Sequence, residues 1–140
     1  MTVQTQDTGK AVSSVIAQSW HRCSKFMQRE TWQTPHQAQG LTFDSICRRK
    51  TALLTIGQAA LEDAWEYMDG RPCALFILDE SACVLTRCGH PDTLEALDSL
   101  GFMAGSYCAE SIIGTCSLSL ASMIGQPVKT LGDQHFKQAL

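Results

Sequence analysis

The chain has 140 residues, of which 44% are hydrophobic and 18% are charged, a balance that is typical of one globular domain and excludes a disordered chain. The longest apolar run, residues 74–78, is far shorter than the ~20 residues that cross a bilayer, and no signal-like apolar segment follows Met1. The net charge is −3 and the sequence pI is about 5.7. We therefore expect a cytoplasmic protein that contacts neither a membrane nor, through this segment, nucleic acid.

The seven cysteines are odd in number, spread along the chain and form no Cys-x-x-Cys pair, which argues against a disulfide framework. The four histidines are isolated and stand at no zinc-ligand spacing. Neither a metal nor a cofactor is expected. We interpret most of the cysteines as small buried hydrophobic residues in a reducing compartment.

The first expected element is a helix over 12–27, after a flexible leader at residues 1–10. Apolar residues recur from Val12 to Phe26 and Met27 at spacings of three and four, which predicts one buried helix face. Trp20 lies on that face and is expected in the core, whereas Arg22 is expected on the solvated side.

A loop over 30–41 then leads to a long predicted helix over 43–68. Thr42 is the expected N-cap, and Asp69-Gly70 with Pro72 is the expected stop. The predicted core face of this helix comprises Ile46, Leu53, Leu54, Ala60, Leu61, Ala64, Trp65 and Met68.

Two strand-like runs, 73–79 and 82–88, flank a turn at 79–81 and predict a hairpin. A short helix over 92–100, a helix over 113–124 that ends at Gly125, a short strand over 126–131 and a helix start at Gln134 follow. These elements predict an α+β fold with a thin sheet. The pattern stops inside the last helix, so we expect the front part of a longer protein.

Four short motifs resemble a known family. They are Ile16-Ala-Gln-Ser19-Trp20-His-Arg22-Cys23, Glu110-x-x-x-Gly114-Thr115, Gln126-Pro127-Val128 and Asp133-Gln134-His135-Phe136. In this order they resemble the sigma-54-type activators that begin with a GAF sensory domain. The resemblance implies a GAF-like antiparallel sheet with flanking helices, incomplete at the C-terminus. It divides the chain into a leader at 1–10, a helix and loop at 11–42 and a truncated GAF domain at 43–140.

Within that family the chain is similar to the activators of glycerol and dihydroxyacetone catabolism, on the segments 25–32, 35–40, 57–68 and 133–138. This resemblance implies a signal-receiving part whose input comes from dihydroxyacetone kinase subunits. It also implies a PAS module, an ATPase segment and a helix-turn-helix in the full-length protein. The chain itself contains no Gly-x-x-x-x-Gly-Lys-Ser/Thr phosphate loop.

The candidate effector pocket consists of Tyr107, Glu110, Thr115 and Cys116. Tyr107-Cys108 stands where the family has a Trp-polar pair, and Cys116 stands where it has Asn, so the small-molecule site is expected to be altered or lost. The alternative interpretation of the same motif is structural, with Thr115 capping a helix and Gly114 supplying a tight turn.

Two further functions stay open at this point. Cys88, Cys108 and Cys116 would be the pocket thiols of a redox enzyme similar to the GAF-fold reductases of free methionine sulfoxide, provided that a nearby cation or helix N-terminus lowers a thiol pKa. The helices at 12–27 and 43–68 would pack against a second copy in a homodimer. We favour a signal-receiving, non-enzymatic chain that acts as a homodimer.

Overall fold

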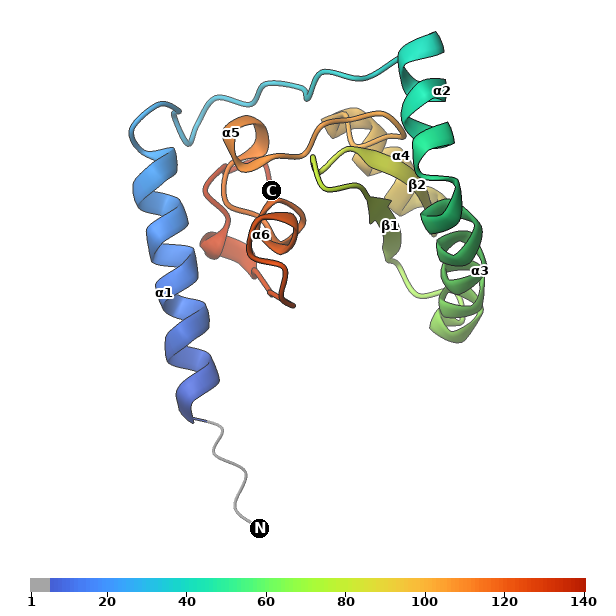
Figure 1. Cartoon of the computed structure of the whole chain (residues 1–140). Helices are drawn as coiled ribbons and strands as arrows, with labels where there is room; N and C mark the ends of the chain where they lie inside the picture. The colour runs from blue at the N-terminus through green and yellow to red at the C-terminus, as the bar shows by residue number, and fades with distance from the viewer. Residues whose placement is uncertain (1–5) are drawn as a thin grey trace. The chain divides into compact units, whose positions relative to one another are not determined.

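The computed structural model describes residues 6–140, with side chains from Ser14 onward. Its α-helices and strands, labelled in Figure 1, are α1 (Gln6–Cys23), α2 (Gly40–Arg49), α3 (Thr51–Met68), β1 (Ala74–Leu78), β2 (Val84–Gly89), α4 (Pro91–Leu100), α5 (Glu110–Ile113) and α6 (Ser117–Ile124). A 3₁₀ helix, η1 (Gly132–Gln134), follows them. Helices flank an antiparallel pair of strands, which confirms the predicted α+β class.

The chain divides into two compact units. Residues up to Gln33 together with Ala109–Leu140 form what we name the terminal unit, and Thr34–Cys108 form the central unit. This division differs from the predicted boundaries after residues 10 and 42, because the two ends of the chain pack into the same unit. The assignment of residues 43–140 to a truncated GAF domain stays a prediction.

Helix α1 of the terminal unit packs by one face. Ile16, Ser19 and Cys23 are buried and recur at the predicted helical spacing. The helix begins at Gln6, so residues 6–10 are helical rather than part of a leader, and residues 1–5 lie outside the described part of the chain.

The predicted buried stripe of α1 is too long at its C-terminal end. Helix α1 ends at Cys23, and the amide of Met27 donates to the Cys23 carbonyl oxygen at 3.0 Å in the turn that follows. The chain leaves the helix axis there, so Met27 is half-buried but Phe26 is 57% exposed.

Two short helices, α5 and α6, replace the single helix that was predicted over 113–124. Gly114 separates them with φ +77°, and a Cβ at this position would lie 3.3 Å from the Phe136 Cβ and 3.4 Å from the Met27 Sδ. The backbone therefore needs glycine here. Gly125 ends α6 with φ +64°, at the predicted position.

The predicted strand over 126–131 is wrong. Pro127 has no N–H to give to a ladder, and the backbone N–H of Ser117 donates to the Thr130 hydroxyl at 3.0 Å, which ties this segment to the start of α6. The helix predicted from Gln134 is also wrong, because η1 ends at that residue and His135 has the extended angles φ −67° and ψ 138°.

Helices α2 and α3 of the central unit replace the single long helix predicted over 43–68. Helix α2 begins at Gly40, and its N-cap is Gln39, three residues before the predicted cap Thr42. Lys50 separates the helices with φ −109° and ψ 23°, and neither glycine nor proline marks the break. Helix α3 ends at Asp69, with φ +50°, as predicted.

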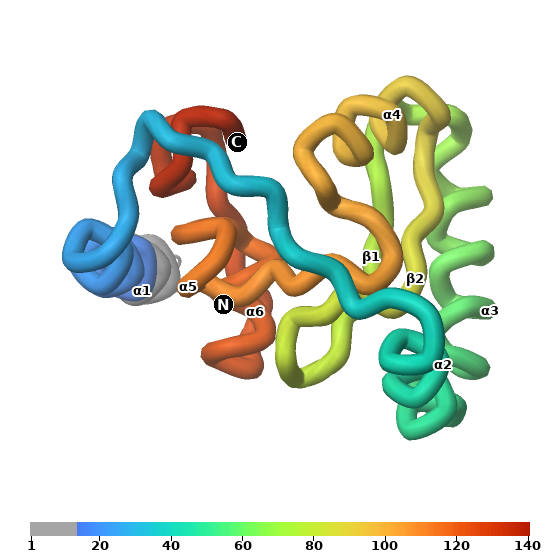
Figure 2. Tube along the Cα trace, turned by 90° about the horizontal axis from the view of Figure 1, so that it is seen from above, coloured from blue at the N-terminus to red at the C-terminus, as the bar shows by residue number. Residues whose placement is uncertain are grey.

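Helix α3 lies along the strands β1 and β2 in both views (Figures 1 and 2). The helix lies close to β1 at Gly57, where a Cβ would lie 2.2 Å from the Ile77 Cδ1. The half-buried residues of the helix include Leu54, Leu61, Ala64, Trp65 and Met68. Leu53 and Ala60, which were predicted in the core, are exposed because they point away from this single contact face.

The predicted hairpin is confirmed. In its turn, the Asp79 carboxylate accepts hydrogen bonds from the backbone N–H groups of Ser81 at 2.9 Å and Cys83 at 3.0 Å. The register pairs Ala74 with Gly89, and a bulge follows Ile77.

Two extended segments of the central unit cover the start of β2 on the side away from β1. The amide of Val84 donates to the Ser106 carbonyl oxygen at 2.9 Å, and the amide of Ala38 donates to the Gly105 carbonyl oxygen at 2.9 Å. Isolated antiparallel bridges pair Cys83 with Tyr107 and Gln37 with Ser106, so these two segments cover this edge of the two-stranded sheet.

Helix α4 matches the predicted helix over 92–100. His90 caps it by accepting the Asp92 amide at its Nδ1 at 3.3 Å, and Gly101 ends it with φ +89°. Arg87 of β2 holds the end of this helix, because its guanidinium pairs with Asp98 and donates to the Phe102 carbonyl oxygen at 2.9 Å. One hydrophobic cluster in the core of the central unit consists of Ala38, Ile46, Cys83 and Leu85.

Candidate functional site

The terminal unit contains a polar cluster, which we name the Glu110 cluster: the buried residues Ser19, Glu110 and Thr115 and the partly exposed Arg22. The Ser19 hydroxyl donates to the Glu110 Oε2 at 2.8 Å and lies 2.6 Å from the Thr115 hydroxyl. With Ser19 donating to the carboxylate, Thr115 donates to Ser19. Every one of these groups therefore has a partner, as buried polar groups require.

Arg22 completes the cluster with a two-point ion pair. Its Nε donates to the Glu110 Oε1 at 2.7 Å and its Nη2 to the Oε2 at 2.9 Å. The Glu110 side chain is 5% exposed, whereas that of Arg22 is 41% exposed. Arg22 was predicted on the solvated side of the helix; it is partly solvated, but its charged end pairs with a buried carboxylate.

The charge of Glu110 is maintained by its donors. Burial raises the pKa of this carboxyl, but the hydrogen bonds from Arg22 and Ser19 outweigh burial, so that the pKa lies below its usual range. The hydrogen bond to Glu110 likewise raises the pKa of Arg22 against the opposing effect of burial. The pair is ionised at neutral pH.

The cluster brings together two motifs that are far apart in the sequence. Ser19 and Arg22 stand three residues apart on one face of α1, and Glu110 begins α5. Glu110 and Thr115 were predicted as site residues, and Ser19 was not. The only available signal was the spacing of Ser19 and Arg22 within the resemblance motif, which does not say what they contact.

Trp20, predicted in the core, is half-buried and packs in the terminal unit. Its ring meets Phe136 edge-on at 5.3 Å, the Arg29 guanidinium lies 4.4 Å above its centroid, and its Nε1 donates to the Gln134 carbonyl oxygen at 2.8 Å.

Cys116 lies next to this cluster in sequence and is buried. It is the N-cap residue of α6, so Thr115 does not cap that helix; the alternative role predicted for Gly114, a tight turn, is confirmed. A hydrogen bond with the Cys116 thiol raises the pKa of His135 above its usual value, although burial opposes the shift. The His135 Nδ1 lies 2.8 Å from the Gly132 carbonyl oxygen.

Tyr107, the fourth predicted pocket residue, belongs to the central unit. It lines a pocket of about 210 Å³ together with Ile46, Arg49, Lys50, Asp79, Glu80 and Ser81. Its ring lies 4.8 Å from that of His36. The terminal unit therefore contains three of the four predicted residues, and any ligand that used Glu110 would first have to displace Arg22 or Ser19.

The structure gives the redox alternative no support. None of the seven cysteines forms a disulfide, and Cys23, Cys83, Cys108 and Cys116 are buried, which fits the expected hydrophobic role. Burial raises the pKa of Cys88, and it raises that of Cys83 to about 11. These shifts are opposite to the lowered pKa that a reactive thiol requires.

Two general findings concern residues 6–140. None of the helices described there is both long and apolar enough to span a membrane. No group of three His, Cys, Asp or Glu side chains gathers among the described residues in a way that could hold a metal ion.

No family model matches the chain. It is 82% identical over 140 residues to the glycerol metabolism operon regulatory protein of Citrobacter freundii, covering all of this chain and 22% of that protein. It is 67% identical over 132 residues to the PTS-dependent dihydroxyacetone kinase operon regulatory protein of Escherichia coli strain K12, covering 94% of this chain and 21% of that protein. The chain thus spans about a fifth of the length of these relatives.

A solved structure resembles the chain in both fold and sequence. It is a chain in the crystal structure of the E. coli DhaR(N)–DhaL complex, with a TM-score of 0.88 and 69% sequence identity. The match covers 90% of this chain and 43% of that one.

Proposed function

The chain is a relative, over its whole length, of the operon regulatory proteins of glycerol and dihydroxyacetone metabolism, and on that premise we propose that it is the signal-receiving part of a transcriptional activator of this catabolism. The identity of 82% along all 140 residues supports this assignment. The DNA-binding and ATP-binding functions of such an activator belong to other parts of the protein.

The signal is the binding of a protein partner, a dihydroxyacetone kinase subunit. The single observation that carries this proposal is the likeness to a chain that was crystallised in the DhaR(N)–DhaL complex, at a TM-score of 0.88 and 69% identity. A backbone so similar presents a similar surface, because the positions of surface side chains follow the fold that carries them.

The Glu110 cluster gives the terminal unit a means to respond. Its hydrogen bonds connect α1 to the segment from Glu110 to Thr115. If α1 moves relative to this segment, these hydrogen bonds are therefore lost or kept as a set. A partner that binds one position of the helix more tightly than another shifts the population toward it, and a partner that binds both equally shifts nothing.

We further propose that the chain acts by binding and not by catalysis, in the cytoplasm and as a homodimer. The regulatory names of its relatives and the raised thiol pKa values of Cys83 and Cys88 support a non-enzymatic role. The amphipathic helices α1 and α3 supply the surface for a second copy, since α3 leaves Ile56 and Tyr67 exposed.

A capture experiment tests the proposed function. The 140-residue chain is immobilised and incubated with each purified dihydroxyacetone kinase subunit at micromolar concentration. We expect retention of a subunit, with unchanged retention by Lys129→Gln, which alters an exposed lysine. Absence of retention, with the chain folded by circular dichroism, would contradict the proposal.

A further inference from the structure

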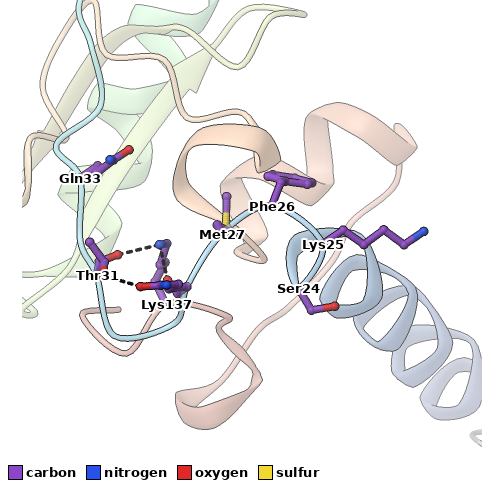
Figure 3. A pocket seen from close by; sticks show the side chains of 8 residues that line it. Ser24, Lys25, Phe26, Met27, Thr31, Gln33 and Lys137 are labelled. Carbon is purple, nitrogen blue, oxygen red and sulfur yellow. Dashed lines mark hydrogen bonds between the residues drawn. The ribbon is translucent and has the colours of Figure 1, made fainter.

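The terminal unit contains a polar pocket that the proposed function does not use. It has a volume of about 480 Å³ and lies between the end of α1 and the loop that follows, with Lys137 on its wall (Figure 3). Its lining residues include two lysines, Lys25 and Lys137, and no carboxylate. The pocket is therefore positively charged.

Lys137 is unusual because it is a lysine that is only 5% exposed. Its ammonium donates to the backbone carbonyl oxygens of Gln28 at 2.5 Å and Thr31 at 2.6 Å, the bonds drawn in Figure 3. Among the described residues, it has no carboxylate at ion-pair distance and no acceptor for its third N–H. A buried ammonium with only neutral partners is incompletely compensated, so an anionic oxygen at this position is favoured.

The position of the ammonium is fixed by its surroundings. The segment that carries Lys137 is bonded to the loop on both sides: the Gln138 amide donates to the Arg29 carbonyl oxygen at 3.0 Å, and the Arg29 Nε donates to the Phe136 carbonyl oxygen at 3.1 Å. The donor is therefore already in position before a ligand binds, and binding costs the protein little conformational entropy.

We propose that this pocket binds a small molecule through a carboxylate or phosphate group, whose oxygen accepts the third N–H of Lys137. The hydroxyl of Thr31 and the exposed ring of Phe26 line the space beside it, for the polar and carbon parts of the ligand. Figure 3 shows the Lys25 ammonium pointing away from Lys137, so Lys25 contributes its positive field and not a direct bond. This small-molecule input is separate from the protein partner of the proposed function.

Backbone NMR of the isotopically labelled 140-residue chain tests this site. The chain is titrated with inorganic phosphate and, separately, with acetate, at constant ionic strength maintained with chloride. We expect saturable shifts of the amides near Gln28, Thr31 and Lys137, and the anion that saturates at the lower concentration identifies the preferred group. Shifts that do not saturate, or that saturate only elsewhere, would overturn the proposal.

Three variants sharpen the result. Lys137→Met should weaken binding about tenfold or more, since it removes a charge-assisted hydrogen bond. Lys25→Gln should weaken it roughly two- to threefold by reducing the field, and the exposed Lys129→Gln should leave it unchanged. If Lys137→Met does not fold, the affinity of Lys25→Gln and the positions of the shifted amides in the wild type decide whether the site exists. Equal affinity in wild type and Lys25→Gln, or in wild type and a folded Lys137→Met, would refute the site.

Discussion

Replacing Arg22 with methionine tests the Glu110 cluster directly. The substitution keeps an aliphatic stem but removes the two hydrogen bonds to Glu110, at 2.7 Å and 2.9 Å. Bonds of this kind to charged groups contribute roughly 1.5–3 kcal/mol each. Arg22 is 41% exposed, so solvent screening reduces that contribution, but Glu110 remains 5% exposed with Ser19 as a donor. We expect the free energy of unfolding to fall by about 2 kcal/mol.

Urea unfolding, followed by circular dichroism and tryptophan fluorescence, measures this loss. The companion variants are Glu110→Gln and the double variant, which removes both charges. We expect the double variant to lose about 1 kcal/mol less unfolding free energy than the two single variants lose in sum, because no charge is then left buried without its partner. Lys129→Gln, an exposed lysine, should differ from wild type by less than about 0.5 kcal/mol. A loss below that size for Arg22→Met, or strict additivity, would refute the reasoning.

Three further outcomes follow from the terminal unit and the thiols. Because the folded-state pKa of Glu110 is lowered, its stabilising effect is complete above the ordinary glutamate pKa of ~4.3 and is lost as the pH falls through the lower folded value. The difference in unfolding free energy between wild type and Glu110→Gln should therefore shrink in acid. A difference that stays constant with pH in urea unfolding would contradict this. Gly114→Ala should cost about 2 kcal/mol in the same assay, because φ +77° with ψ −163° is a region that only glycine adopts readily, and an unchanged midpoint would be incompatible with that backbone. The native cysteines should react with a disulfide reagent at neutral pH no faster than a model thiol, since burial raises the pKa of Cys23, Cys83 and Cys88; a faster thiol would revive the redox alternative.

Local sequence patterns predicted correctly those helix faces and helix ends that are determined by residues close together in the sequence. The spacing of Ile16 and Cys23 predicted the buried face of α1, and Asp69-Gly70 predicted the end of α3. The break at Lys50 carries no glycine or proline, so periodicity alone extended one helix through it. The strand over 126–131 was predicted from this local segment alone, whereas Thr130 is bonded to the start of α6.

The candidate site was predicted in its residues but not in its partners. Glu110 and Thr115 were identified from a motif, yet their nearest polar neighbours, Ser19 and Arg22, lie roughly ninety residues earlier in the chain. Sequence spacing cannot show such a long-range pairing. The pocket at Lys137 was missed for the same reason, because it forms only when the C-terminal segment lies against the carbonyls of Gln28 and Thr31.

Sedimentation velocity shows whether this chain receives its signal by binding a protein. The 140-residue chain and a purified dihydroxyacetone kinase subunit are mixed at micromolar concentration and compared with each component alone. We expect a faster boundary that contains both proteins and grows with the concentration of the subunit. Two independent boundaries, unchanged from those of the separate components, would contradict it.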